Sequence, residues 1–190
     1  PSSDNMESQL LRLAELTSGP LGIYECPAPE HRQLSAETAG RIAQTGRFHF
    51  VKETSRNAED CAAKVRAAKN TSMRIFSATL SIAPQVLDLG ADGHCGTVVN
   101  FCPELTSAMC ALKDSAERSR IHQSLDVINN AVIYKGYPSS GKYVLQKRGL
   151  HLTAVSRAGD PAEFNDELRA RLDDMLAHFD FQNGLMPEKQ

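Results

Sequence analysis

Tryptophan is absent from this 190-residue chain, and aromatic residues make up only 6% of it. No apolar run approaches the roughly 20 residues of a membrane-spanning helix, and no cationic segment followed by an apolar one suggests a secretion signal. No two cysteines have the C-x-x-C spacing, and we expect the odd set of five to be reduced thiols in a cytoplasmic protein. The formal net charge is only -2, so we expect neither nucleic acid nor a membrane as a partner.

The rest of the composition is ordinary for a folded globular protein, with 41% hydrophobic and 23% charged residues. A chain of this length can bury a sizeable core as one domain or slightly more. Two kinds of pattern meet near residue 115. Strand and helix patterns alternate before it, and only helical patterns are evident after it.

Four strands separated by helices are predicted before residue 115. The expected strands cover residues 21–25, 48–52, 73–77 and 94–99, and the expected helices cover 8–16, 35–45, 58–69 and 79–89, with another from Pro103. Ser35 is a suitable N-cap, and Pro84 is expected to kink or shorten its helix. After residue 115 we expect helices over 118–133, 139–148 and 161–179.

Strands that alternate with helices favour a parallel sheet of four β/α units followed by a helical extension. Such a sheet is either a small open one or half of a (β/α)8 barrel. The first unit begins with a helix, which suggests that a preceding strand lies outside the sequence. In both architectures functional side chains gather at the carboxyl ends of the strands.

Lys52 ends a strand in which the alternate residues Phe48 and Phe50 are aromatic. By alternation Lys52 is expected to share their face, where the strand gives way to a helix. Burial disfavours the charged form of an amine, and a neutral amine can attack a carbonyl carbon. The alternative is an ordinary lysine that reaches solvent.

Tyr24 ends the preceding strand, 28 positions before Lys52, which is about one strand–helix repeat. If the two strands are parallel neighbours, both side chains emerge at one edge of the sheet. There the phenol could hydrogen-bond to the amine or relay protons to a bound carbonyl compound. Cys26 is expected on the face of Tyr24, and Glu53, on the opposite face from Lys52, is expected to form a salt bridge.

Two further patterns resemble binding sites but depart from them. Residues 136–143 nearly spell a phosphate-binding loop, but Tyr143 stands where a small hydroxyl should hold magnesium, and no strand leads into it. His94 and Cys95 are adjacent on a strand and point to opposite faces, and no second pair follows at ligand spacing. We therefore expect a loop and helix start in the first case and no metal site in the second.

Taken together, the motifs resemble the dihydrodipicolinate synthase/N-acetylneuraminate lyase family of Schiff-base-forming class I aldolases. The resemblance covers essentially the whole chain, but only about the last two-thirds of a typical member. It is carried by Tyr24-Glu25-Cys26-Pro27, Val51-Lys52-Glu53-Thr54-Ser55, Leu89-Gly90-Ala91-Asp92-Gly93, Asn100-Phe101-Cys102-Pro103 and Tyr137-Pro138-Ser139-Ser140-Gly141-Lys142.

The resemblance implies a (β/α)8 TIM barrel, of which residues 1–115 are the last four β/α units and residues 116–190 a C-terminal three-helix extension, in a dimer or tetramer. It implies that Lys52 forms an imine with pyruvate or another 2-oxo acid and that Tyr24 transfers protons. Thr54 and the backbone near Cys95 and Gly96 would line the substrate pocket, with no metal and no organic cofactor. Cleavage by an aldolase and dehydration of a 2-oxo sugar acid both remain open, since an imine serves either.

The chain departs from the family pattern in two respects. Dihydrodipicolinate synthases carry an arginine five residues after the tyrosine, where this chain has Pro29 with Arg32 nearby, and many members have a glycine where this chain reads Ala78. We therefore expect a sugar-acid or other 2-oxo-acid substrate rather than a role in lysine biosynthesis. Residues 1–20 contain neither the threonine-rich carboxylate-binding turn nor the second tyrosine of the family's first half. We expect a piece of a longer polypeptide; the alternatives are a chain that pairs with another to close the ring, and a non-catalytic remnant.

Overall fold

The computed structural model of the protein describes residues 3–185, which form two compact units that divide after Gly96. The first unit contains a parallel sheet whose strand order is the order of the chain. Its strands are β1 (Leu21–Tyr24), β2 (Phe48–Glu53), β3 (Arg74–Ser77) and β4 (Gly93–His94). Its helices are α1 (Ser3–Leu16), α2 (Ala36–Gln44), α3 (Ala58–Ala67), the 3-10 turn η1 (Leu80–Ile82) and α4 (Ala83–Asp88).

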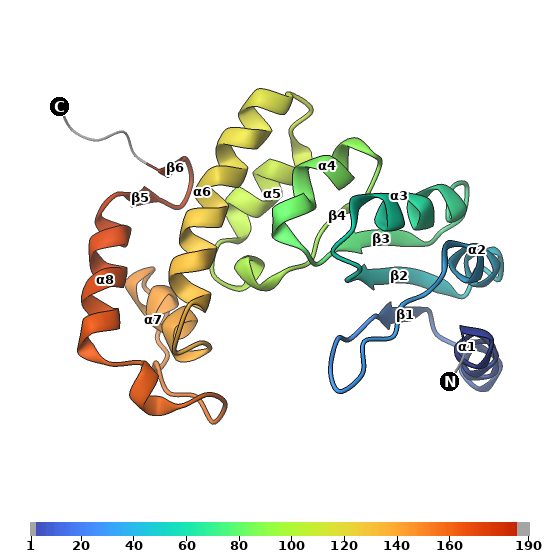
Figure 1. Cartoon of the computed structure of the whole chain (residues 1–190), viewed down its shortest axis with the longest axis horizontal. Helices are drawn as coiled ribbons and strands as arrows, with labels where there is room; N and C mark the ends of the chain where they lie inside the picture. Colours follow the sequence, from blue (N-terminus) through green and yellow to red (C-terminus); the bar gives the residue numbers. More distant parts are fainter. Residues whose placement is uncertain (1–2, 186–190) are drawn as a thin grey trace. The chain divides into compact units, whose positions relative to one another are not determined.

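The helices of the first unit follow one another along one side of the sheet (Figure 1), with α1 against α2, α2 against α3 and α3 against α4. This arrangement follows from repeated crossovers between parallel neighbours, which are right-handed in nearly all proteins. The predicted β/α units are therefore confirmed.

Strand alternation separates two faces of the sheet. Ile23, Val51 and Ile75 are register partners, and all three are buried in the core that packs against the helices. Tyr24 and Lys52, also register partners, belong to the other face, where the side chain of Tyr24 is 51% exposed and that of Lys52 is partly exposed. The two faces thus differ in burial, as alternation requires.

The prediction that Phe48 shares a face with Phe50 and Lys52 is wrong. Phe48 is fully buried in the core cluster that contains Val51, whereas Phe50 is only partly buried. The pairing of β1 with β2 is irregular here: Leu21 is opposite Phe48 but Gly22 is opposite Phe50. The extra residue on β2 breaks the alternation, as a β-bulge does.

Caps and prolines set most helix ends where the sequence predicts them. The Ser35 hydroxyl accepts a hydrogen bond from the Thr38 N–H, 3.0 Å away, at the start of α2. The helix predicted over 79–89 is divided into η1 and α4, and Pro84 lies in the first turn of α4. A proline in a first turn loses no helical hydrogen bond, which explains the shortened helix.

The fourth strand is shorter than predicted, since residues 97–100 form a 3-10 helix, η2. Its partner β3 ends at Ser77, and the last pairing bond runs from the Cys95 N–H to the Ser77 carbonyl oxygen over 2.8 Å. Beyond that point the strand has no neighbour on β3 to pair with, so the backbone turns into η2.

The second unit is mainly helical. It contains η2 (Thr97–Asn100), α5 (Pro103–Ala111), α6 (Ser115–Ile133), α7 (Ser139–Lys147), the 3-10 turn η3 (Pro161–Glu163), α8 (Asp166–Ala177) and the antiparallel strands β5 (Phe179–Asp180) and β6 (Gly184–Leu185). The division of the chain after residue 115 into barrel half and extension stays a prediction.

Three local predictions for the second unit need correction. Helix α6 begins before Arg118, because the Asp114 carboxylate caps it by accepting the Glu117 N–H. The helix predicted over 161–179 is interrupted, because Asn165 caps a new helix by accepting the Leu168 N–H. The β5–β6 pair was not predicted, since strands of two residues are too short for an alternating pattern.

The loop over residues 136–143 has the predicted form. Helix α7 begins within it at Ser139, and the element before it is the helix α6 rather than a strand. The Tyr143 hydroxyl donates to the Asp173 carboxylate at 2.9 Å. The tyrosine is thus part of a contact between α7 and α8.

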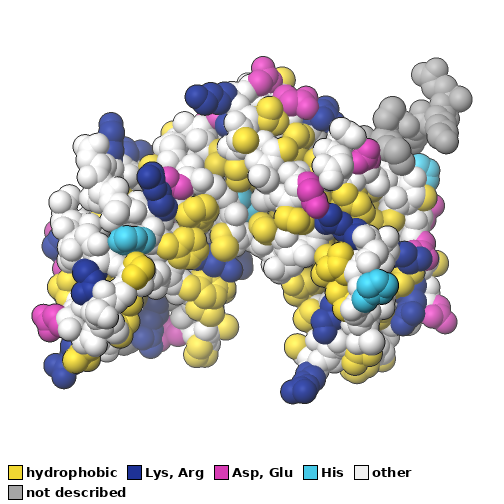
Figure 2. Space-filling view, turned by 180° about the vertical axis from the view of Figure 1, so that it is seen from behind, with side chains coloured by type: hydrophobic (Ala, Val, Ile, Leu, Met, Phe, Trp, Pro, Cys, Tyr) yellow, Lys and Arg dark blue, Asp and Glu magenta, His cyan; other side chains and the backbone are white. Residues whose placement is uncertain are grey.

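Charges of both signs are mixed with hydrophobic side chains on the face that Figure 2 shows. This mixture accords with a formal net charge close to zero. Among the helices within residues 3–185, none is long and apolar enough to cross a membrane.

Candidate active site

Lys52 and Tyr24 lie side by side at the carboxyl ends of β2 and β1. They are register partners, and the Lys52 Nζ lies 4.3 Å from the centroid of the Tyr24 ring. The strands are held together beyond them by a hydrogen bond of 3.2 Å from the Glu25 N–H to the Lys52 carbonyl oxygen. An amine over an aromatic face is a cation–π arrangement, which favours this placement of the lysine. The structure thus brings the two predicted residues together.

The pKa of the Tyr24 phenol is raised above its usual value of 10.0. The main cause is desolvation of the part of the ring that the fold covers; a hydrogen bond with the Cys26 thiol and the charges of Cys26 and Cys95 raise it further. Cys26 therefore contacts the tyrosine, as alternation predicts. At neutral pH the phenol keeps its proton, so it is a hydrogen-bond donor.

Two aromatic rings lie on the same face as Lys52. Phe76 is its register partner on β3, and the Phe50 and Phe76 rings pack with centroids 5.1 Å apart. Both side chains are partly buried. Lys52 thus belongs to a face of the sheet on which aromatic rings of β1, β2 and β3 lie.

The Thr54 hydroxyl is engaged by protein groups. It donates to the Glu25 carbonyl oxygen at 2.6 Å, and the His31 Nε2 lies 2.8 Å from its oxygen. The threonine is 7% exposed. These contacts join the end of β2 to the loop that follows β1, and the predicted substrate contact of Thr54 stays a prediction.

Cys95 and Gly96 directly follow β4 and lie close to the end of β3. A Cβ atom at Gly96 would lie 2.8 Å from the Ala78 carbonyl oxygen and closer still to the His94 ring. Only glycine fits there without a shift of the backbone. The Cys95 side chain is partly buried and its N–H is used in pairing with Ser77, so its predicted part in substrate binding stays a prediction.

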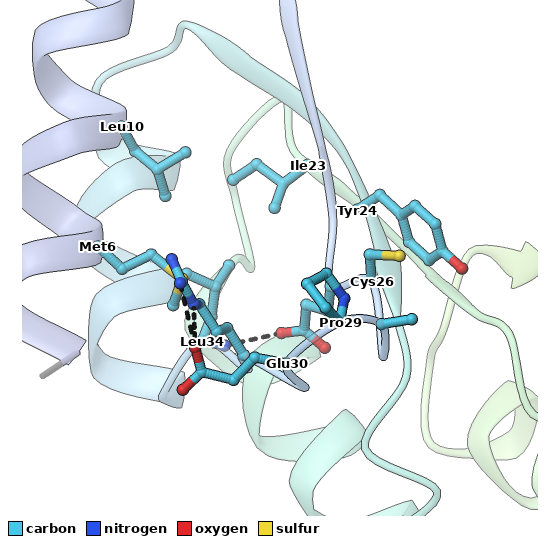
Figure 3. Close-up of a pocket in the computed structure, with 11 residues that line it drawn as sticks. Met6, Leu10, Ile23, Tyr24, Cys26, Pro29, Glu30 and Leu34 are labelled. Carbon is cyan, nitrogen blue, oxygen red and sulfur yellow. Dashed lines mark hydrogen bonds and ion pairs between the residues drawn. The ribbon is translucent and has the colours of Figure 1, made fainter. Parts of the chain in front are cut away.

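The loop after β1 contains Pro29, the first of the two positions at which the chain departs from the family pattern. Pro29, Glu30 and Arg32 line a cavity of about 410 Å³ between this loop, α1 and β1, with Met6, Leu10 and Ile23 on its apolar side (Figure 3). Arg32 donates to the Glu30 carboxylate at 3.1 and 3.2 Å, and both side chains are exposed. Tyr24 projects from the opposite side of β1 to Ile23 (Figure 3), so its phenol lies away from that apolar side.

A buried cluster of charge lies behind the two candidate residues. Lys64 of α3 reaches between Glu25 and Glu53, and all three side chains are at most 3% exposed. The salt bridge predicted for Glu53 is confirmed, but its partner and the part of Glu25 were missed. The available signals were a lysine on the apolar face of α3 and a glutamate directly after each candidate residue.

No group of three metal-binding side chains is found within residues 3–185. The buried Cys61 thiol lies near the Glu53 carboxylate, which helps to raise the pKa of the thiol.

Iodoacetamide at about pH 8 is expected to modify Cys26 in the folded protein and to leave Cys61 and Cys102 intact. The Cys26 side chain is exposed, whereas burial raises the pKa of each of the other two thiols to about 12. About one such thiol in 10⁴ would be ionised at that pH, and the thiolate is the nucleophile. Peptide mass spectrometry measures the modification, and unfolding in urea is the control that should expose both thiols. Rapid labelling of Cys61 before unfolding would contradict the burial.

The fold is that of a partial (β/α)8 barrel. The first unit has a four-stranded parallel sheet with its helices in one row, and the candidate residues lie at the carboxyl ends of neighbouring strands. The second unit is mainly helical. Dihydrodipicolinate synthase from Acinetobacter baumannii, in a complex with pyruvate, is 24% identical to the chain with a TM-score of 0.77, over 93% of this chain and 61% of that one. A variant of the 2-keto-3-deoxygluconate aldolase of Sulfolobus solfataricus is 21% identical with a TM-score of 0.74, over 93% and 59%. These likenesses confirm the predicted fold.

The chain belongs to the Dihydrodipicolinate synthetase family, which it matches over residues 1–178. The 4-hydroxy-tetrahydrodipicolinate synthase of Ralstonia nicotianae is 26% identical over 179 residues, which are 92% of this chain and 60% of that protein. The enzyme of the same name from Listeria welshimeri is 25% identical over 82% of this chain and 54% of its own. The chain thus spans little more than half the length of these relatives.

Proposed function

We propose that this chain carries the nucleophile of a Schiff-base-forming lyase or aldolase that acts on pyruvate or another 2-oxo acid. The observation that supports the proposal is the Lys52 amine, 4.3 Å from the centroid of the Tyr24 ring at the carboxyl ends of adjacent barrel strands. In barrels of this class, reactive groups lie at that edge. The cytoplasmic location expected from the cysteines is part of the proposal.

In the proposed reaction, the neutral Lys52 amine attacks the ketone carbon of the substrate and forms a carbinolamine. Loss of water, with a proton supplied to the departing oxygen, leaves the imine. The protonated imine accepts the electron pair of the carbon–carbon bond that breaks, or stabilises the carbanion that precedes dehydration. Tyr24 holds its proton at neutral pH and is the donor proposed for the departing oxygen.

Other groups at the strand ends complete the proposed site. Thr54, Cys95 and Gly96 are the residues that the family resemblance assigns to the substrate pocket. The relatives are longer than this chain, and the sheet face with Tyr24 and Lys52 is partly exposed. We propose that further β/α units, from the same polypeptide or from a second chain in an oligomer, cover this face and bind the substrate carboxylate.

Within the 2-oxo acids we propose a sugar-acid type of substrate. Pro29 stands where dihydrodipicolinate synthases have an arginine, and the nearby Arg32 guanidinium is already paired with Glu30. A paired arginine is less available to a second carboxylate. The similar proteins include both 4-hydroxy-tetrahydrodipicolinate synthases and a 2-keto-3-deoxygluconate aldolase. The preference is tested by measuring the activity of this protein on the substrates of both enzymes.

Incubation with pyruvate and sodium borohydride tests the imine directly. Borohydride reduces an imine to a stable secondary amine, which peptide mass spectrometry locates. We expect one adduct, at Lys52, that depends on pyruvate. An adduct only at other lysines would exclude Lys52 as the nucleophile, and a folded chain without any adduct would show that these 190 residues do not form a working Schiff-base site by themselves.

Tyr24→Phe is expected to slow the trapping of the imine by about 100-fold or more, because general acid–base catalysis commonly contributes that much. The variant keeps the ring beneath the Lys52 amine and removes only the hydroxyl. The initial rate of adduct formation is measured by mass spectrometry. Tyr134→Phe, at an exposed tyrosine directly after α6, is the matched control and should leave the rate unchanged. An unaltered rate in Tyr24→Phe would remove the tyrosine from the mechanism.

A further inference from the structure

The two strand ends that carry Tyr24 and Lys52 are held from behind by buried charges. Glu25 and Glu53 directly follow the two candidate residues, and their side chains point to the helix side of the sheet, where Lys64 of α3 meets both. The exposed fractions are 1% for Glu25, 0% for Glu53 and 3% for Lys64. Charges buried to this extent are costly unless they are paired and hydrogen-bonded.

The Lys64 ammonium group donates all of its hydrogen bonds to the two carboxylates. Lys64 Nζ lies 2.8 Å from Glu25 Oε1, 3.0 Å from Glu25 Oε2 and 3.0 Å from Glu53 Oε1. An ammonium group has three protons to donate, and three carboxylate oxygens are within reach. A single side chain from α3 therefore ties the end of β1 to the end of β2.

The same carboxylates hold the backbone of the segments that follow the strands. Glu25 accepts the Leu34 N–H at 2.9 Å and the Thr54 N–H at 3.1 Å, and Glu53 accepts the Ser55 N–H at 2.8 Å. These bonds reach the loop before α2 and the two residues after β2. The backbone around both candidate residues is thereby fixed by the charged cluster.

Stability alone does not explain a cluster of this kind. Replacing a buried ion pair or triad by well-packed apolar residues of similar volume is often neutral or stabilising. On the same helix side of the sheet, Ile23, Val51 and Ile75 supply apolar packing. What the charged cluster adds is direction, since hydrogen bonds to charged groups fix distance and orientation where apolar contacts do not.

We propose that Lys64 is a positioning residue: through Glu25 and Glu53 it sets the placement of the Lys52 amine over the Tyr24 ring that imine formation requires. Neighbouring residues of a strand point to opposite faces, so holding Glu25 and Glu53 behind the sheet holds Tyr24 and Lys52 in front of it. Misplacement of reacting groups by about 1 Å can cost about 100-fold in rate. The inference rests on the proposed function for its consequence in the reaction, but the placement itself can be measured without a substrate.

The test uses the 190-residue chain and a triple variant, Glu25→Gln, Glu53→Gln and Lys64→Met, which removes all three charges at nearly constant volume. The first measurement is the rate of borohydride trapping with pyruvate at Lys52. The second is the NMR shift of the Lys52 ε-methylene protons in protein labelled with ε-carbon-13 lysine, assigned with Lys52→Arg. The Tyr24 ring should shield these protons, since the amine lies over its face. The matched control, Glu59→Gln with Arg66→Met, removes an exposed ion pair from the same helix.

We expect the triple variant to remain folded by circular dichroism, to lose most of the ring-induced shift and to trap pyruvate about 10- to 100-fold more slowly. The control should match the native chain in both measurements. The proposal would be overturned if the triple variant kept the NMR shift of the native chain. It would also be overturned if the variant lost that shift but trapped pyruvate at the rate of the native chain. If the native chain forms no adduct, these residues alone do not perform the proposed function, while loss of the shift in the triple variant still supports positioning by Lys64.

A single variant covers the case in which the triple variant does not fold. Glu53→Met removes both hydrogen bonds that the Glu53 carboxylate accepts, keeps the pair between Lys64 and Glu25, and leaves no buried carboxylate without its lysine. We expect a partial loss of the shift and a slower trapping rate, because only the end of β2 is released. Retention of both native values in this variant would also overturn the proposal.

Discussion

Lys52→Ala is expected to abolish the pyruvate adduct, a loss of at least about 1,000-fold, while the fold is retained. The imine requires a primary amine at this position, and no other residue of the site has one to offer in its place. The side chain is only partly buried and lies over the Tyr24 ring, so its removal leaves the core intact. Borohydride trapping followed by peptide mass spectrometry measures the loss.

Two further variants make this result specific. Lys52→Arg keeps a cation over the Tyr24 ring but cannot become a neutral amine at ordinary pH, so it should also form no adduct. Lys69→Ala removes an exposed lysine that follows α3 and should trap pyruvate at the native rate. Continued trapping in Lys52→Ala, with the circular dichroism of the native chain, would show that another lysine is the nucleophile.

Lys64→Met is expected to lower the free energy of unfolding by about 3–5 kcal/mol, the usual cost of removing one partner from a buried ion pair. It leaves Glu25 and Glu53 facing each other, at most 1% exposed, without the amine that both now share. With a typical dependence of stability on urea, the midpoint of unfolding should fall by about 2 M. Urea titration followed by circular dichroism measures the shift.

The control for this prediction lies two residues further along the same helix. Arg66 pairs with Glu59 on the surface, with both side chains more than half exposed, and Arg66→Met should change stability by less than about 1 kcal/mol. The triple variant with all three buried charges removed should recover much of the stability lost in Lys64→Met. A midpoint for Lys64→Met equal to that of Arg66→Met would show that the buried cluster does not depend on its lysine.

Much of the first unit was predictable because its signals are local. Short apolar runs bounded by turn residues predict β1, β2 and β3, and the spacing of one repeat between Tyr24 and Lys52 is that of parallel neighbours, which β1 and β2 are. Ser35 acts as the cap that its type and place indicate. Helix starts in the second unit were less predictable, because the cap Asp114 lies before the predicted helical pattern and the cap Asn165 lies within one.

The surroundings of the candidate residues were less predictable than the residues themselves. Phe48 faces the core because β2 has one extra residue where it pairs with β1. Nothing in the sequence of β2 itself indicates this irregular pairing. The engagement of Thr54 by the Glu25 carbonyl and by His31 depends on the course of the loop after β1. Such contacts follow from how the loop folds back, and no periodic pattern encodes that.

The sequence by itself determined the order of strands and helices in the first unit, the pair Tyr24 and Lys52 proposed for the site, and the family. These signals are local, because periodicity and motif spacing depend on residues close together in the chain. Only the tertiary structure decided which groups hold that pair in place. Lys64 and Glu25 are 39 positions apart, and Lys64 and Glu53 are 11 apart. Whether such side chains come within 3 Å depends on how α3 packs against the sheet, and packing is a property of the whole unit rather than of any segment.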